Sequence, residues 1–307
     1  MITDVSRQHL SLGAWLKADP PNGILHSMAQ QAWRGCLRFS LHPLGMFGLA
    51  IILLVVFAAL AAPWLTSYDP VTQNLLERLQ PPSAEHWFGT DEFGRDIFAR
   101  IVYGARTTLY IIMLVTIIVA PIGLLIGVCA GYLGGWADEV LMRVTDVFLS
   151  LPGLVLALGF AAALGPGITN AIIAIALTAW PPIARLARAE ALSLKQADFI
   201  AAVRLQGASR WRIIFRHIVP MCLPSVIVRV TLSMAGVILT AAGLGFLGLG
   251  AQPPMPEWGA MVSTGREFMI DSPWVVIAPG ISIAAVSLAF NLVGDALRDT
   301  LDPRGGE

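Results

Sequence analysis

Long uncharged apolar runs alternate with charged segments along this chain of 307 residues. A helix crosses a hydrocarbon core of ~30 Å with about 20 residues, so each such run is a candidate membrane span. The run 147–184 is too long for one crossing, and Gly165-Pro166-Gly167 predicts a tight turn that divides it into two helices. The six predicted spans lie in residues 44–62, 107–132, 147–184 (two spans), 224–250 and 274–294.

Composition also indicates a membrane protein. Hydrophobic residues make up 56% of the chain and charged residues 13%, whereas a soluble domain carries about 25% charged residues. The net charge is zero, which argues against nucleic acid as a partner. Cys36, Cys129 and Cys222 lie far apart and form no CxxC pair, so neither a disulfide framework nor a metal site is predicted.

Lysine and arginine are concentrated in residues 185–216, which contain seven of the 20 in the chain. The positive-inside rule places such segments in the cytoplasm. With six spans, both termini then lie on the cytoplasmic side, as tails 1–43 and 296–307, and residues 67–106 form an external loop. The first span, in residues 44–66, is predicted to be an uncleaved anchor because its apolar run starts too late for a signal peptide. We expect a multi-pass protein of the cytoplasmic (inner) membrane, in contact with lipid.

Ionisable residues are few inside the predicted spans. Arg143 and Asp146 lie three residues apart at the start of the third span, where a local ion pair at the membrane interface is favoured over a proton relay. The spans contain neither paired carboxylates nor a Ser/His arrangement, so no catalytic residue is predicted. A P-loop needs a lysine directly after a glycine, and neither Lys17 nor Lys195 follows one. We expect no enzyme activity and no cofactor in this chain, with any ATP and Mg²⁺ used by partner subunits.

Gly123, Gly127 and Gly131 recur every four residues in the second span. Small residues at this spacing let two membrane helices approach closely. We therefore expect this face of the second span to pack against a neighbouring helix, and the pattern carries little information about function.

The charged segment 185–220 contains further order. Residues 191–206 lack glycine and proline and are predicted to be helical, and Gly207 is predicted to end that helix. Apolar residues then recur at steps of three and four, which predicts a second short helix. They are Trp211, Ile214, Phe215 and Ile218. Either this pair of helices packs on the spans of its own chain, or it is presented to a groove on a partner.

Residues 198–220 read DFIAAVRLQGASRWRIIFRHIVP. This stretch resembles the EAA loop of binding-protein-dependent ABC importer permeases, in which the loop docks on the ATPase subunit. The central glycine of that pattern falls on Gly207 and its terminal proline on Pro220, whereas Ala201 stands at its glutamate position, one turn from Asp198. The resemblance implies that the coupling residues are Asp198, Ala201, Ala202, Gly207, Ala208, Trp211, His217 and Pro220.

Four other stretches resemble the "C" permease of the dipeptide and oligopeptide importers, in the same order along the chain. They are HWFGTDEFGRDIFARIVYGARTTL, GYLGGWADEVLMRVTDVFLSLPGL, LGFLGLGAQPPMPEWGAMV and FNLVGDALRDTLDPR. The resemblance implies an all-α membrane protein with six transmembrane helices and the type I ABC importer transmembrane fold (MetI-like). The permease domain would comprise residues 105–295, with its cytoplasmic coupling loop at 185–220.

The resemblance also implies an assembly. Its other members would be a second homologous permease subunit, two ATP-binding subunits and an extracytoplasmic solute-binding protein. External segments 67–106 and 251–273 would meet the binding protein, with candidate contacts at Asp91, Arg95, Asp96, Pro253 and Trp258. The implied solute is a dipeptide or oligopeptide. Nickel, glutathione and other small solutes stay open as cargoes of the same class, and a stand-alone channel or ion-coupled carrier stays open as a different class.

Overall fold

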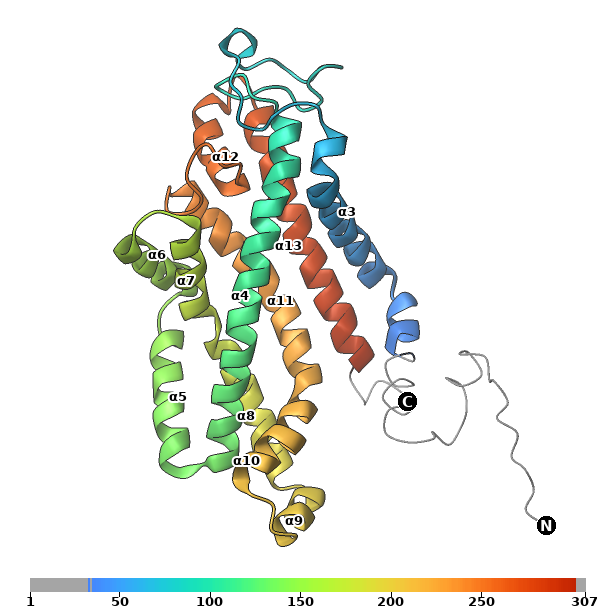
Figure 1. The fold of residues 1–307 in the computed structure, drawn as a ribbon, viewed down its shortest axis with the longest axis vertical. Coiled ribbons are helices and arrows are strands. Elements are labelled where there is room, and N and C mark those ends of the chain that lie inside the picture. Colours follow the sequence, from blue (N-terminus) through green and yellow to red (C-terminus); the bar gives the residue numbers. More distant parts are fainter. Residues whose placement is uncertain (1–32, 34, 302–307) are drawn as a thin grey trace, which may run out of the picture.

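The computed structural model describes residue 33 and residues 35–301, so most of the predicted N-terminal tail and the end of the C-terminal tail lie outside the described residues. The described part is an elongated bundle of helices that run along one long axis (Figure 1). The helices are α3 (Pro43–Leu65), α4 (Ile97–Leu133), α5 (Gly135–Leu149), α6 (Gly153–Leu164), α7 (Ile168–Ala179), α8 (Pro181–Lys195), α9 (Asp198–Leu205), α10 (Arg210–Ile213), α11 (Val219–Phe246), α12 (Trp258–Gly265) and α13 (Trp274–Leu301).

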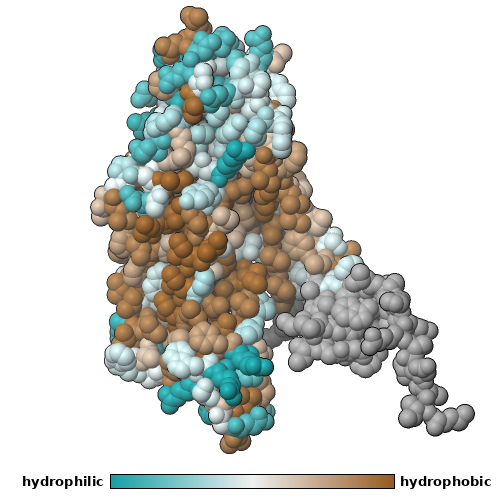
Figure 2. Space-filling model, viewed as in Figure 1, coloured by the Kyte–Doolittle hydropathy of each residue, from teal (hydrophilic) through white to brown (hydrophobic). Residues whose placement is uncertain are grey.

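Five helical stretches are long and apolar enough to cross a membrane, and the pair α5 and α6, bent by 90° between them, provides a candidate sixth. The six predicted spans agree with this count. On the face shown in Figure 2, hydrophobic side chains form a broad belt across the middle of the bundle, and hydrophilic side chains gather at both ends. Such a belt is the surface expected of a chain that sits across a bilayer.

The predicted turn at Gly165-Pro166-Gly167 is confirmed, because α6 ends at Leu164 and α7 begins at Ile168. The predicted ends of the neighbouring spans are wrong. Helix α8 continues the path of α7 to Lys195, well into the segment that the sequence assigned to a loop. Its charged residues are accommodated because α5 supplies acids: Arg188 pairs with Asp138, and their second hydrogen bond is 2.7 Å long.

The prediction of a local pair between Arg143 and Asp146 is also wrong. Asp146 on α5 instead accepts a hydrogen bond of 2.7 Å from Arg185 on α8. Helices α5 and α8 lie side by side, so a carboxylate on one can reach a guanidinium on the other. These two cross-helix pairs attach α5 to α8 along the end of the bundle that carries α9.

The regularly spaced glycines of α4 form a close seam with α8. A Cβ atom at Gly123 would lie 2.8 Å from the Ile183 Cβ, and one at Gly131 would lie 2.7 Å from the Arg188 carbonyl oxygen. At Gly127 it would collide with the carbonyl of Ala184. The predicted packing role of these glycines is confirmed, because no larger residue fits between the two backbones.

The first span packs on the last one. Gly45 and Gly48 of α3 face α13, where a Cβ at Gly48 would lie 2.7 Å from the Ala289 carbonyl oxygen and one at Gly45 would collide with Ala296. Helix α3 also contacts α4, and most of its remaining surface is exposed in the single chain. In Figure 1 it stands at the edge of the bundle.

The predicted helix 191–206 is interrupted. Helix α8 ends at Lys195, and α9 starts at Asp198 after Ala197 adopts an extended conformation with ψ 142°. The sequence has no glycine or proline there, so helix propensity does not explain the break. Ile200, fully buried in the core of the bundle, fixes the direction of α9 instead.

The predicted second short helix does not stand alone. Helix α10 passes through one π-helical turn, Ile214–Ile218, directly into α11. Ile214 and Ile218 are completely buried, whereas Trp211 and Phe215 are exposed. One side of this stretch therefore belongs to the core of the bundle and the other side faces outward.

Candidate functional site at the two ends of the bundle

The α9–α10 segment (residues 198–213) projects from one end of the bundle and turns at a glycine. Gly207 has a φ of +81°, a left-handed conformation that glycine adopts freely and that most other residues, asparagine and aspartate apart, adopt only with strain. Its amide donates to the Arg204 carbonyl over 3.0 Å and so closes the end of α9. Beyond the turn, the Ser209 hydroxyl accepts from the Arg212 amide over 3.3 Å and starts α10.

The residues that the resemblance assigns to coupling lie mostly on the surface of this segment. Asp198, Ala201, Ala202, Gly207, Trp211 and Pro220 are exposed, and Ala208 and His217 are half-buried. The structure thus brings most of them to one protruding surface, with the segment held to the bundle by Ile200 and Ile213. Ala201, which stands at the glutamate position of the EAA pattern, lies on this surface, so the surface has no acidic side chain at that position.

Sequence reasoning missed two apolar side chains of the same segment. Phe199 is 41% exposed and Leu205 is 89% exposed. They join Trp211, whose ring stacks on Phe215 with 6.1 Å between the ring centroids. Exposed large apolar residues at a charged, polar end of the molecule are typical of a surface that a partner covers. Phe199 is next to buried Ile200 in the sequence and Leu205 is the last residue of α9, so both are apolar residues within the charged stretch that the sequence analysis singled out.

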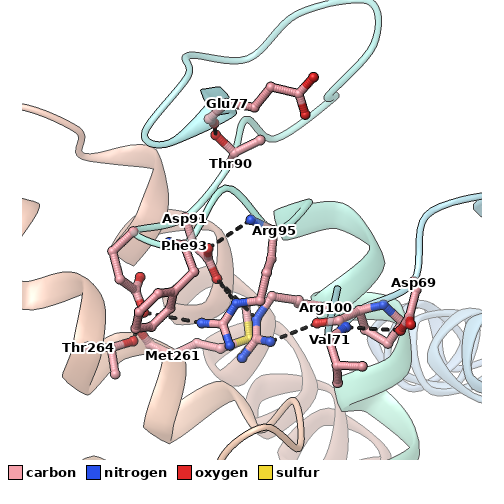
Figure 3. A network of polar contacts seen from close by, with 12 residues as sticks. Asp69, Val71, Glu77, Thr90, Asp91, Phe93, Arg95, Arg100, Met261 and Thr264 are labelled. Carbon is pink, nitrogen blue, oxygen red and sulfur yellow. Dashed lines mark hydrogen bonds and ion pairs between the residues drawn. The ribbon is translucent and has the colours of Figure 1, made fainter. Parts of the chain in front are cut away.

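At the opposite end, the α3–α4 loop (residues 66–96) is tied together by buried charges (Figure 3). Asp91 and Arg95 are 3% and 6% exposed, and the Arg95 Nε donates to the Asp91 carboxylate over 2.7 Å. Arg100, at the start of α4, lies 3.4 Å from the same carboxylate and donates to the Pro70 carbonyl over 2.8 Å. One carboxylate therefore holds two guanidinium groups, which satisfies charges that would be costly alone.

Glu92 completes this network with a bond of 3.2 Å from Arg95, while its second carboxylate oxygen is buried without a partner among the described residues. Burial and the neighbouring Asp91 raise the pKa of Glu92 above its ordinary value. Glu92 and Arg100 were missed in the sequence analysis, because only the structure places them beside Asp91.

A second pair fixes the start of α4. Asp96 caps the helix by accepting from the Ala99 amide over 2.6 Å, and its other oxygen lies 2.8 Å from His86 Nδ1. His86 Nε2 lies 3.5 Å from Glu77, so the imidazole bridges two acids of the loop. The loop is thus folded onto the first turn of α4 rather than left to find its shape on a partner.

This burial corrects the choice of binding-protein contacts. Asp91, Arg95 and Asp96 have their side chains inside the α3–α4 loop. Trp258 is 2% exposed, and its indole Nε1 donates to the Ile101 carbonyl over 3.1 Å. Of the five predicted contact residues, Pro253 alone is exposed. The four buried residues support the exposed surface at this end of the bundle. That this end of the bundle binds the solute-binding protein stays a prediction.

The comparison with protein families decides the class. Residues 123–305 match the model of the binding-protein-dependent transport system inner membrane component, and residues 27–82 match the N-terminal transmembrane domain of oligopeptide transport permease C. The chain belongs to the family of binding-protein-dependent transport system inner membrane components. The family resemblance read from the sequence is confirmed, and the chain is a permease component of such a system.

Similar proteins cover nearly the whole permease. It is 47% identical to a dipeptide transport system permease protein of Alkalihalophilus pseudofirmus over 90% of this chain and 91% of the relative. It is 46% identical to a probable D,D-dipeptide transport system permease protein of Escherichia coli K12 over 86% of this chain and 89% of that protein. A glutathione transport system permease protein of Pectobacterium atrosepticum is 43% identical, over 90% and 91%.

A solved structure has the same fold. The permease resembles a chain of the inward-facing MetNI methionine ABC transporter with a TM-score of 0.54 and 20% identity, over 65% of this chain and 95% of that one. The predicted all-α, MetI-like fold is therefore confirmed.

Proposed function

We propose that this permease is one of two membrane subunits of an ATP-driven importer that carries dipeptides or oligopeptides across the cytoplasmic membrane. The α9–α10 segment carries the proposal, because it offers an exposed, partly apolar surface at one end of a membrane bundle while its buried side is anchored in the core. One of two ATP-binding subunits would cover that surface. An extracytoplasmic solute-binding protein would meet the opposite end, where Pro253 is exposed.

The proposed orientation puts both termini and the α9–α10 segment in the cytoplasm. The seven lysines and arginines of residues 185–216 support it. Movement of the ATP-binding subunits would then displace the α9–α10 segment, and buried Ile200 and Ile213 would pass that displacement to α8 and α11. The two permeases would open alternately to the two sides by rigid-body rocking. ATP and Mg²⁺ would act on the partner subunits, and this chain would take no catalytic part.

The peptide class rests on relatives whose names specify dipeptides. A relative named for glutathione is consistent with the glutathione alternative, but it is less similar to this chain than the two relatives named for dipeptides. The direct test is uptake in a strain that lacks this gene and then receives it back. Labelled dipeptide, longer peptide, glutathione and nickel are offered in turn, and ATP-dependent dipeptide uptake that follows the gene is expected. Restored uptake of nickel alone would overturn the peptide assignment.

A stand-alone channel or carrier makes a different prediction. It would give solute flux in vesicles that contain this chain alone, whereas the proposed subunit gives flux only with the second permease, the ATP-binding subunits and the binding protein. The purified chain alone should also hydrolyse no ATP. Flux or ATP turnover by the chain alone would contradict the proposal.

A further inference from the structure

A cavity of about 430 Å³ lies between the end of α4 and the α9–α10 segment. Three cations from three places in the chain line it: Lys195 at the end of α8, Arg204 on α9 and Arg210 on α10. Tyr132 and Ser209 add a phenol ring and a hydroxyl group, and none of the lining residues is acidic. The side chains that line the cavity therefore create a positive electrostatic potential in it and offer hydrogen-bond donors.

An aromatic ring orients two of these three cations, and no acid among the described residues pairs with any of the three. The Lys195 ammonium and the Arg204 guanidinium each lie 6.0 Å from the centre of the Tyr132 ring, an attraction that orients them without cancelling their charge. None of the three forms an ion pair with any residue that the structure describes. The acid near Lys195, Asp138, is already bound by Arg188 through two hydrogen bonds.

We propose that this cavity binds a carboxylate side chain of the ATP-binding subunit, as a second point of attachment beside the exposed surface of the α9–α10 segment. The inference rests on the proposed function, because it needs an ATP-binding partner. Residues 195–216 hold five lysines and arginines against one acid, Asp198, so a partner surface of negative charge is complementary to this end.

The position of the cavity favours a protein carboxylate over a lipid or a free anion. It lies at the far end of the bundle, beyond the hydrophobic belt, where α9 and α10 project (Figures 1 and 2). A partner covering exposed Leu205 and Trp211 would hold its own acidic residue in place beside the cavity. A free phosphate compound would gain no such positioning and would pay the full entropy of association.

The attachment would have a mechanical consequence. Tyr132 lies in the last turn of α4, whereas Arg204 and Arg210 lie on the two sides of the Gly207 turn. A carboxylate in the cavity would therefore bind α4 and the α9–α10 segment together. Motion of the ATP-binding subunit would then reach α4 directly as well as through α8 and α11.

The test compares two double variants that remove the same charge from the same basic stretch, residues 195–216. Lys195→Gln/Arg204→Gln removes two cations of the cavity, and Arg212→Gln/Arg216→Gln removes two cations that, like Arg204, are exposed in the single chain but do not line the cavity. Each permease is purified in nanodiscs, and the affinity of its copurifying ATP-binding subunits is measured across a range of salt concentrations. Because desolvated charge contacts are worth more than rim charges, we expect the cavity variant to weaken binding about ten-fold or more and the control less than about three-fold.

The outcomes separate the alternatives. Equal losses for the two variants, or no loss in either, would overturn the cavity assignment while leaving the importer proposal intact. Failure of the unaltered chain to bind any ATP-binding subunit would instead overturn the proposed function. Unfolding temperatures equal to that of the unaltered chain guard against misfolding, and Arg210→Gln serves as a second, single-site variant.

Two further arms exclude other anions. Inorganic phosphate and ATP are titrated into the permease without its partners, and binding that the cavity variant loses would reassign the cavity to a phosphate compound. Nanodiscs of phosphatidylcholine are compared with nanodiscs that contain phosphatidylglycerol. Association of the ATP-binding subunits that requires the anionic lipid would overturn the carboxylate assignment in favour of a lipid headgroup.

Discussion

The charged side chains at the two ends of the bundle differ in whether they form ion pairs within the chain. In the α3–α4 loop, Asp91 holds Arg95 and Arg100 inside the chain. Beside the α9–α10 segment, Lys195, Arg204 and Arg210 line an open cavity and form no ion pair with the residues that the structure describes, next to exposed aromatic side chains. An end whose buried charges form ion pairs with one another has a fixed shape of its own. An end whose cations and apolar side chains have no partner among the described residues is shaped for a partner, so the contrast indicates the kind of surface, acidic and partly apolar, that the α9–α10 end accepts.

The largest effect is expected at the partner end, from Gly207→Pro. Proline fixes φ near −65° and cannot adopt the φ of +81° that the turn requires. Uptake should be abolished while membrane insertion and the unfolding temperature of the bundle are kept. Gly207→Asn is the matched control, because asparagine tolerates the left-handed conformation and nothing lies within 4 Å of a Cβ there. Normal uptake by the proline variant would contradict the coupling role, as would normal uptake by Ala202→Glu.

The second largest effect is expected from Asp91→Ala, at the end of the bundle where the α3–α4 loop carries buried ion pairs. Removal of the carboxylate leaves two buried guanidinium groups without their shared partner, which should lower the free energy of unfolding by about 3–5 kcal/mol. Thermal unfolding in detergent measures this loss. Asp69→Ala, an exposed acid of the same loop, should change stability by no more than about 1 kcal/mol. Equal effects of the two variants would show that the network does not hold the loop.

A smaller effect is expected in the helix that joins the two ends. Gly127→Ala forces a Cβ against the backbone of α8 at Ala184, and overpacking of this kind costs about 1–3 kcal/mol. Gly236→Ala on α11 is the control, because open space surrounds that position. We expect the unfolding temperature to fall for the first variant and to hold or rise for the second.

The smallest effect is expected from Glu92→Gln. Since burial and Asp91 raise the pKa of Glu92, the folded chain keeps this proton to a higher pH than the unfolded chain does. Its contribution to stability therefore falls as pH rises through the window between the two pKa values. Glutamine removes that dependence and keeps a partner for Arg95. The variant should be slightly more stable than the unaltered chain above this window, and a lower unfolding temperature at neutral pH would contradict the account.

Sequence reasoning predicted the number of spans because apolar length is decided locally, by the residues in each run. It failed at the span ends, where Arg185 and Arg188 are paired with acids on α5 that are about 40 or 50 residues away in the chain. It also missed the break before α9, because buried Ile200 rather than a local breaker sets it. Information that resides in tertiary contacts is not visible in a single run of sequence.

The sites divide in the same way. The exposed position of Gly207 and Trp211 agreed with the predicted loop because a glycine turn and an amphipathic pattern are local features. Trp258 was expected on the outside, since an interfacial tryptophan and a buried one have the same sequence signature. Only the packing of its ring over Gly104, where a Cβ would lie 2.8 Å from its Nε1, distinguishes them.

The seam between Gly48 of α3 and Ala289 of α13 imposes an order on biogenesis. The first span leaves the ribosome long before the helix that it packs against, by a delay on the order of 10–50 s at about 5–20 residues per second. During that time α3 must be stable in lipid without α13, although it can already pack on α4. Its 23 residues contain no charged side chain, so α3 is stable in the membrane before α13 is inserted. Docking of α3 on α13 would then complete the helix bundle of the newly synthesised subunit.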